Sequence, residues 1–360
     1  MTYQQRQDTA VIIPARDEED RIADCLAALA GQSPARVSVV LVVNNTTDRT
    51  AERAREAAGK GGMDLTVLDC TLSDGEGVGT ARRRGAEHAL RHIPHLRYLM
   101  TTDADCIVAS DWVDRNLAHL QRVDVVCGKV ELIEAEADIL QSMDREAATL
   151  EGTYRALVQD FYARHAPGSA DICDTHGEAA GASLAIRREA YLDIGGFAPT
   201  ICGEDRALVR AVRAAGHRVH HADDVVVRAS CRLNGRAAGG MSDALKARIA
   251  GADYLIDDCL PPADWLMSHA RAMTLGPWPP QVPPRLRLNV RDVPGHIAAL
   301  KEFTNSGGED PISKAPVIVA PRTSVAPEWP DDGLAEPRRP GTSGPCTHAA
   351  RRACSTVTNS

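Results

Sequence analysis

Four apolar runs separated by helical patterns dominate the first 105 residues of the chain. Runs rich in Val, Ile and Leu are typical of strands buried on both faces of a parallel sheet, and here they cover residues 11–13, 37–43, 65–68 and 96–100. The segment after the first run carries apolar side chains at helical spacing, at Ile22, Cys25, Leu26 and Leu29. This alternation predicts an open, doubly wound parallel sheet flanked by helices. Ligands bind such sheets at the carboxyl ends of the strands.

The second half of the chain is less regular. Its composition predicts helices over residues 135–165, 204–215 and 241–260, the first of them long or broken, and strands at 182–186, at 219 and at 225–227. Prolines crowd the segment that begins at Pro261. Residues 305–360 show little periodicity and much Pro, Gly, Ser, Thr and Arg, which predicts a disordered tail.

Composition limits the classes of function. The formal net charge is -8, from 41 basic and 49 acidic side chains, and only 4% of residues are aromatic, which argues against a nucleic-acid partner. The ten cysteines form no Cys-x-x-Cys pair, and Cys25, Cys127 and Cys259 lie in apolar runs, so we expect buried, reduced thiols. No stretch approaches the roughly 20 apolar residues of a membrane span, and residues 1–8 lack an apolar signal core. These features predict a cytoplasmic protein without a transmembrane segment.

The most informative acids follow the fourth apolar run. Asp103 and Asp105 are separated by one residue, so both carboxylates can face one cation at the end of a strand. Magnesium and manganese prefer oxygen ligands and often bind substrate phosphates as well. A D-x-D spacing alone is common in surface loops; its place after a predicted buried strand is what favours a metal site.

Other polar side chains lie in turns and at helix starts. Asn44 opens a polar turn that either binds a nucleobase and ribose or only caps the next helix. Arg82 follows a glycine-rich loop, and Arg232 and Arg236 lie beside glycines in a later loop. Arginines in such places suit a diphosphate; the alternative for each is a basic surface.

Acids also open the helix predicted over residues 204–215. One carboxylate of Glu204 and Asp205 can accept a proton from an attacking hydroxyl, or both can serve only the helix N-terminus. His176 and Glu178 lie in a polar loop that can shape a substrate pocket, although a single loop histidine is usually structural.

Five motifs over residues 9–250 resemble, in order and spacing, family 2 glycosyltransferases of the GT-A fold. They are Ile-Pro-Ala-Arg-Asp-Glu-Glu at 13–19, Asn-Asn-Thr-Thr-Asp at 44–48, Ala-Arg-Arg-Arg-Gly at 81–85, Asp-Ala-Asp at 103–105 and Gly-Glu-Asp at 203–205. The resemblance implies an α/β fold with a central, mostly parallel sheet flanked by helices. It also implies an inverting transfer of a sugar from a nucleotide-diphosphate donor to an acceptor hydroxyl.

The resemblance also implies roles for individual residues. Asp103 and Asp105 match the motif that holds Mn²⁺ or Mg²⁺, and Asp205 matches the catalytic base, supported by Glu204. The residues expected near the nucleotide sugar are Pro14, Arg16, Asp17, Asn44, Arg82, Asp103, Arg232 and Arg236.

The sequence departs from the family pattern in three respects. Many members carry an acid where Asn44 stands. Many also carry a histidine metal ligand after a late strand, where this chain reads Arg-Ala-Ser at 228–230. The aromatic Q-x-x-R-W motif of processive polysaccharide synthases is absent. Because the aromatic motif is absent, we expect a single-addition enzyme. Because the histidine is absent, either the metal has fewer protein ligands or Arg232 and Arg236 share the phosphate charge.

These inferences predict a domain organisation. Residues 1–260 form the GT-A domain, with a nucleotide-sugar-binding half at 9–125 and an acceptor half at 126–260. A Pro-rich extension at 261–304, expected to be helical, and the tail at 305–360 follow. The acceptor can be a small molecule, a saccharide or a lipid-linked compound. Two alternatives are a noncatalytic nucleotide-sugar-binding module and a sugar nucleotidyltransferase, which would carry a glycine-rich loop where this chain has residues 14–18.

Overall fold

The computed structural model describes residues 8–32, 37–236, 239–251 and 253–306. The chain divides into compact units at residues 1–329 and 330–360, and all described residues lie in the first unit. The predicted tail at 305–360 therefore falls almost wholly outside the described residues.

An eight-stranded sheet forms the centre of the fold, in the order β3-β2-β1-β4-β7-β6-β8-β5. The pairs β3-β2, β2-β1 and β1-β4 are parallel, as are β6 and β8, whereas β7 is antiparallel to both of its neighbours and β5 to β8. The sheet is thus mostly parallel, as expected. The strands are β1 (Thr9–Ala15), β2 (Val37–Asn44), β3 (Leu65–Cys70), β4 (Tyr98–Thr101), β5 (Cys106–Val108), β6 (Val125–Leu132), β7 (Leu184–Arg187) and β8 (Val219–Ala229).

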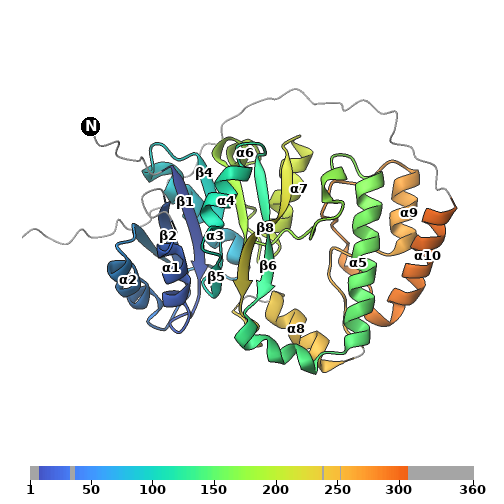
Figure 1. The fold of residues 1–360 in the computed structure, drawn as a ribbon, viewed down its shortest axis with the longest axis horizontal. Coiled ribbons are helices and arrows are strands. Elements are labelled where there is room, and N and C mark those ends of the chain that lie inside the picture. Colours follow the sequence, from blue (N-terminus) through green and yellow to red (C-terminus); the bar gives the residue numbers. More distant parts are fainter. Residues whose placement is uncertain (1–7, 33–36, 237–238, 252, 307–360) are drawn as a thin grey trace, which may run out of the picture. The chain divides into compact units, whose positions relative to one another are not determined.

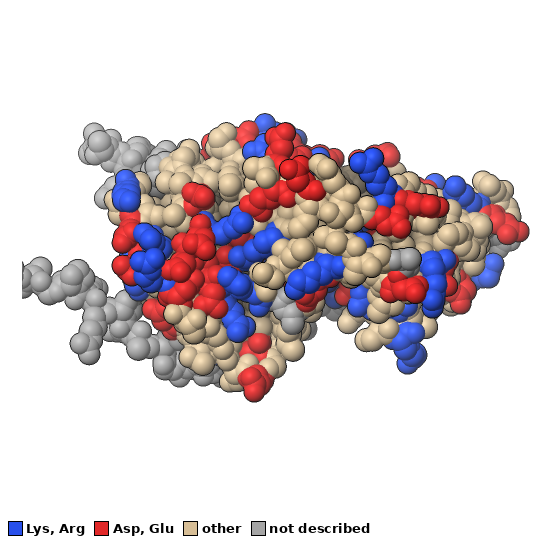
Figure 2. Space-filling view, turned by 90° about the horizontal axis from the view of Figure 1, so that it is seen from below, with Lys and Arg blue, Asp and Glu red and all other residues tan. Residues whose placement is uncertain are grey.

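The carboxyl ends of β1, β2 and β4 lie at one edge of the sheet because these strands are parallel. In Figure 1, β1 runs downward, so this edge is the lower one. Figure 2 views the molecule from that side and shows acidic and basic side chains interleaved over it.

Helices pack on both faces of the sheet. The helices are α1 (Ile22–Ala30), α2 (Thr50–Gly61), α3 (Val78–His92), α4 (Trp112–His119), α5 (Arg145–His165), α6 (Arg188–Asp193), α7 (Glu204–Ala214), α8 (Met241–Ala250), α9 (Ala263–Arg271) and α10 (Val293–Asn305). Short 3-10 helices cover Glu134–Ser142, Ala170–Ile172, Pro284–Leu286 and Val290–Asp292.

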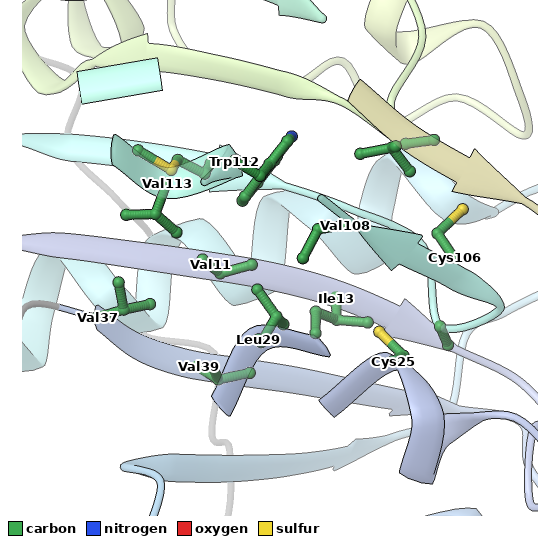
Figure 3. Packing of buried hydrophobic residues seen from close by; sticks show 14 of the residues in the cluster. Val11, Ile13, Cys25, Leu29, Val37, Val39, Cys106, Val108, Trp112 and Val113 are labelled. Atoms are coloured by element: carbon green, nitrogen blue, oxygen red, sulfur yellow. The ribbon is translucent and has the colours of Figure 1, made fainter. Parts of the chain in front are cut away.

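Alternate residues of β1 face two separate cores, which explains its unbroken apolar run. Val11 and Ile13 pack with α1, α2 and α4, and Figure 3 shows them between Leu29 of α1 and Trp112 of α4. Ala10 and Ile12 pack with α3, α6 and α7 on the other face. The prediction of a strand buried on both faces is confirmed.

A third core lies away from the sheet, where α5 packs against α9 and α10 (Figure 1). The side chain of Asp144 caps α5 by accepting hydrogen bonds from the backbone amides of Glu146 and Ala147. Tyr154, Trp278 and Leu300 are buried there. Residues 135–165, predicted as one long or broken helix, form a 3-10 helix followed by α5, and the predicted helical extension after residue 260 is observed.

Several predictions for the second half were wrong. Residues 219–229 form one strand, not two, because Asp223 and Asp224 bulge out of the ladder while the pairing with β6 continues on both sides. The helix predicted over 241–260 ends at Ala250, since Gly251 has a φ of +106° that breaks it. β5, α4 and β6 were not predicted.

The expectation of buried, reduced thiols is met by the three cysteines that were named from the sequence. Cys25, Cys127 and Cys259 are buried and carry free thiols. Burial raises the pKa of all three thiols, so they stay protonated at neutral pH.

Candidate active site

An open cavity of 1740 Å³ lies at the carboxyl edge of the sheet. Single small-molecule pockets usually measure about 300–1,000 Å³, so this cavity has room for two substrates. Loops after β1, β2, β4 and β8 form part of its wall, together with the first turn of α7. Of the eleven site residues predicted from sequence, ten line it: Pro14, Arg16, Asn44, Arg82, Asp103, Asp105, Glu204, Asp205, Arg232 and Arg236.

Asp17 is the predicted site residue that does not line the cavity. Its carboxylate accepts hydrogen bonds from the backbone amide and hydroxyl of Thr47, at 2.8 and 3.2 Å. Asp17 therefore links the loop after β1 to the turn after β2, and both of these segments contribute residues to the cavity wall.

Asp103, whose side chain is 37% exposed, pairs with a buried arginine. The guanidinium of Arg82 donates to Asp103 with one terminal nitrogen and to Glu204 with the other. Arg82 is 3% exposed and Glu204 is 1% exposed. Among the described residues, Nε of Arg82 has no hydrogen-bond partner. Arg82 thus links the loop after β4 to the first turn of α7 rather than standing free for a ligand.

Asp105 also pairs with an arginine that contacts a buried glutamate. Nη2 of Arg232 lies 3.0 Å from Oδ2 of Asp105. The same guanidinium pairs with both carboxylate oxygens of Glu18, and the Nη1–Oε2 distance is 2.7 Å. Glu18 is 5% exposed. Each aspartate is therefore held by an arginine that is itself held by a buried glutamate.

Glu18 was not predicted as a site residue. It lies in the run of acids at 17–20 that reads as a helix start, and nothing in its local sequence points to a partner 214 residues away. We use the name DxD cluster for the six residues Glu18, Arg82, Asp103, Asp105, Glu204 and Arg232.

The DxD cluster carries an excess of negative charge. Its four carboxylates and two guanidiniums leave two negative charges when all are ionised. Burial, and then the nearby charge of Asp103, raise the pKa of Asp105 to about 6. A divalent cation would balance this charge.

The donor set fits a hard divalent cation. Ligand atoms of Asp103, Asp105 and Cys106 lie within 4.8 Å of one another. Each aspartate uses one oxygen for its arginine, so a cation could reach the other oxygen of each directly, and it would reach both oxygens of one aspartate only if the arginine moved away. Burial raises the pKa of the Cys106 thiol, which stays protonated, and hard cations prefer oxygen in any case. Of these three groups, the two carboxylates are therefore the ones that suit such a cation.

Asp205 is oriented by two backbone amides. Its Oδ2 accepts from the amide of Gly181 at 2.8 Å, and its Oδ1 accepts from the amide of Arg206 at 2.7 Å. Gly203, with a φ of +76°, precedes α7 and makes no side-chain cap. Asp205 lines the cavity, and these two hydrogen bonds hold its carboxylate there.

Gly181 holds Asp205 and Arg82 together. A Cβ at this position would lie 2.4 Å from Cζ of Arg82, so only glycine fits. Its carbonyl accepts from the hydroxyl of Thr101 at 2.6 Å, which anchors the loop to β4.

Arg236 fastens the loop after β8 to the loop after β1. Its Nε and Nη2 donate to the carbonyl of Asp17 at 3.1 and 3.0 Å. Together with the Arg232–Glu18 pair, this contact closes one side of the cavity.

A second charged group lines the other end of the cavity. Asp257 lies 2.9 Å from Arg155 and 3.2 Å from Arg206, and Arg206 also pairs with Asp258. We call these four residues the Asp257 cluster. Burial opposes ionisation of Asp257, but Arg155 and Arg206 outweigh it and hold its pKa well below its usual value. Both aspartates lie in the segment wrongly predicted as helix, so sequence reasoning missed them.

Glu178 and His176 differ in their placement. Glu178 lines the cavity, and burial raises the pKa of its carboxyl. His176 lies within hydrogen-bond distance of the carbonyl of Cys127, at 3.2 Å, and burial lowers its pKa, which fits the structural alternative. The carbonyl of Glu178 also bonds to Nδ1 of buried His221 at 3.0 Å.

None of the helices in the described ranges has the length and apolar content needed to cross a bilayer.

Residues 10–191 match the family described as glycosyl transferase family 2. No curated protein matches the sequence. Similar solved structures include the mannosyltransferase PcManGT from Pyrobaculum calidifontis in complex with GDP-Man and Mn²⁺, at 21% identity over 85% of this chain and 77% of that chain, with a TM-score of 0.48. S. aureus TarS 1–349 in complex with UDP-GlcNAc is similar at 16% identity, over 83% and 74% of the two chains, with a TM-score of 0.47.

Proposed function

The chain belongs to glycosyl transferase family 2, and we propose that this glycosyltransferase moves a sugar from a nucleotide-diphosphate donor to an acceptor hydroxyl with inversion, assisted by Mn²⁺ or Mg²⁺. One observation carries the proposal: Asp205 and the DxD cluster face the same two-substrate cavity and are joined through Gly181 and Arg82.

The donor would lie at the sheet end of the cavity. Pro14, Arg16 and Asn44 line the part beside β1 and β2, where the nucleoside would sit. Arg232 and Arg236 border the same part from the loop after β8 and would meet the diphosphate. The contacts of Arg82 favour a positioning role, because its guanidinium pairs with two carboxylates and its side chain is 4% exposed, against 19% for Arg232.

Asp103 and Asp105 would hold the divalent cation. The cation, when bound, neutralises charge that develops on the departing diphosphate. The arginines around the two aspartates keep both carboxylates oriented toward the cavity.

Asp205 would act as the general base. Its two backbone hydrogen bonds fix the carboxylate, which takes the proton of the acceptor hydroxyl as that oxygen bonds to the anomeric carbon. The bond from the anomeric carbon to the phosphate oxygen breaks, and the nucleoside diphosphate leaves with the electron pair. Attack opposite the leaving group inverts the anomeric centre. Glu204, which is buried against Arg82, supports Asp205 from the same helical turn.

Replacing the base separates catalysis from binding. We expect Asp205→Asn to lower turnover by about 10²–10⁴-fold, the usual contribution of a general base. Turnover is measured as release of nucleoside diphosphate from UDP-glucose, UDP-N-acetylglucosamine or GDP-mannose in Mn²⁺, with water as acceptor. Calorimetry with UDP or GDP and Mn²⁺ should give an unchanged affinity.

Asp114→Asn is the matched control, because Asp114 is an exposed acid on α4 that does not line the cavity. It should leave both readouts at the wild-type level. Full turnover by Asp205→Asn would remove Asp205 as the base. A folded wild-type protein that bound neither diphosphate would contradict the donor class.

A further inference from the structure

We propose that Arg232 and the divalent cation compete for Asp105, so that loading the cation frees the Arg232 guanidinium to turn toward the donor diphosphate. This inference rests on the proposed function, because it concerns the metal and the diphosphate of that same site.

Arg232 occupies part of the coordination space of Asp105. Its Nη2 lies 3.0 Å from Oδ2 of Asp105, so a cation that takes both carboxylate oxygens must displace it. The pair is partly exposed, with 19% of the Arg232 side chain and 21% of the Asp105 side chain accessible. Among the described residues, Nε of Arg232 has no hydrogen-bond partner. The guanidinium therefore has an unused donor that a phosphate oxygen could satisfy.

A bound cation would weaken the attraction that holds Arg232 beside Asp105. The DxD cluster carries two excess negative charges without a cation, and a divalent cation brings the sum to zero. With the cation in place, the attraction between Arg232 and Asp105 is largely cancelled, because the cation lies nearer the carboxylate. A diphosphate that arrives with the donor then restores a negative partner for Arg232.

Arg232 and Arg82 differ in their freedom to move. The side chain of Arg82 is 4% exposed and is held between Asp103 and buried Glu204. Arg232 extends from a loop into the cavity and is more exposed. Arg232 is therefore the guanidinium that can change partner while Arg82 stays.

The backbone around Arg232 is anchored on both sides. The carboxylate of Glu136 accepts from the hydroxyl of Ser230 at 2.7 Å and from the amide of Cys231 at 3.0 Å. Arg236 bonds to the carbonyl of Asp17. The change of partner is thus a side-chain rotation, for which Glu18 serves as the pivot by holding the guanidinium near the cavity. Glu18 is a positioning residue in this scheme.

Titration of Mn²⁺ without nucleotide tests the competition directly. We expect Arg232→Gln to bind Mn²⁺ at least about fivefold more tightly than wild type, because no ion pair has to break. Free Mn²⁺ is followed by electron paramagnetic resonance. The same variant should bind UDP or GDP at least about fivefold more weakly in saturating Mn²⁺, since the diphosphate loses a charge-assisted donor. Tighter binding of Mn²⁺ together with weaker binding of UDP or GDP by this variant would indicate the exchange.

Arg236→Gln is the matched control, because Arg236 lies in the same loop but bonds to a backbone carbonyl instead of Asp105. It should not tighten Mn²⁺ binding. Arg232→Lys, which keeps the charge, should stay near the wild-type Mn²⁺ affinity and guards against a folding defect in the glutamine variant.

Unchanged or weaker Mn²⁺ binding by Arg232→Gln would overturn the competition, as would equal tightening by Arg236→Gln. This failure is distinct from failure of the proposed function. The Mn²⁺ titration needs no donor or acceptor, whereas the function fails if the wild-type protein neither binds nor cleaves a nucleotide-diphosphate sugar.

Discussion

The two ends of the cavity hold similar side chains in different balance. The DxD cluster has four carboxylates and two guanidiniums, whereas the Asp257 cluster has two of each. The pKa values of Asp105 and Asp257 differ in the same sense, although burial raises the pKa of Asp258, the other aspartate of the Asp257 cluster. Burial and the charge of Asp103 raise the pKa of Asp105 to about 6, while Arg155 and Arg206 hold that of Asp257 low despite burial.

This difference in charge balance indicates that the DxD cluster, and not the Asp257 cluster, needs a cationic ligand to become neutral. A buried excess of charge is costly unless a partner compensates it. The DxD cluster lacks that partner and suits a divalent cation. The Asp257 cluster is complete in itself, and it joins the start of α7 to the segment after α8 as a preformed wall.

The largest contrast should be in stability. Removing the Arg82 guanidinium in Arg82→Met leaves Glu204, which is 1% exposed, as an unpaired buried charge. We expect the free energy of unfolding to fall by about 3–5 kcal/mol. Arg206→Met should cost about 1 kcal/mol, because Asp257 keeps Arg155 and Asp258 is half exposed. Urea unfolding at pH 7.5 measures both. Equal losses would show that Glu204 depends on Arg82 no more than Asp257 and Asp258 depend on Arg206.

The second contrast is in cation-dependent binding. We expect Asp105→Asn to weaken the binding of UDP or GDP in Mn²⁺ at least about tenfold, since even residues behind metal ligands cost about 10–100-fold in affinity. Asp258→Asn, at the balanced end, should change this affinity less than about twofold. Calorimetry with and without Mn²⁺ compares the pair. If Asp258→Asn weakened nucleotide binding more than Asp105→Asn did, the cation would bind at the Asp257 cluster, which would contradict our scheme.

The smallest contrast is in the response to acid. Because the pKa of Asp257 is lowered in the folded state, its ionised form stabilises the fold above the unfolded value of 3.8, and this contribution is lost as the pH falls below it. We expect Asp257→Asn to lower the free energy of unfolding at pH 7 by about 1 kcal/mol.

The difference between Asp257→Asn and wild type should shrink as the pH falls from 4 to 2. Asp114→Asn, an exposed control, should show no such convergence. Urea unfolding across this range checks both variants. A gap that stays constant would show that Asp257 does not titrate as its two arginines require.

The fold of the first half could be predicted because its signals are local. The run at 37–43 is long, β-branched and buried on both faces, and α1 shows its apolar stripe in the sequence itself. β5 has only three residues, too few for a periodic pattern. In β8 the polar bulge at Asp223 and Asp224 divides one strand into two apparent ones. Pairing with β6 holds that strand together, and pairing is not a local property.

The candidate site divides in the same way. Asp103 and Asp105 stand at the end of a predicted strand, so their position at the carboxyl edge followed from the fold class. Asp205 opens a predicted helix, and the family resemblance marked it as a site residue. Their roles stay predictions. Glu18 and Asp257 gave no signal, because what makes them notable is a partner elsewhere in the chain.

The sequence by itself determined the mostly parallel sheet and the edge at which Asp103 and Asp105 stand, because the periods of strands and helices depend on neighbouring residues. Only the tertiary structure decided how these acids are paired. Arg82 reaches Glu204 across 122 residues, and Arg232 reaches Glu18 across 214. An ion pair depends on distance in space and on burial, and both arise only when the strands and loops have packed.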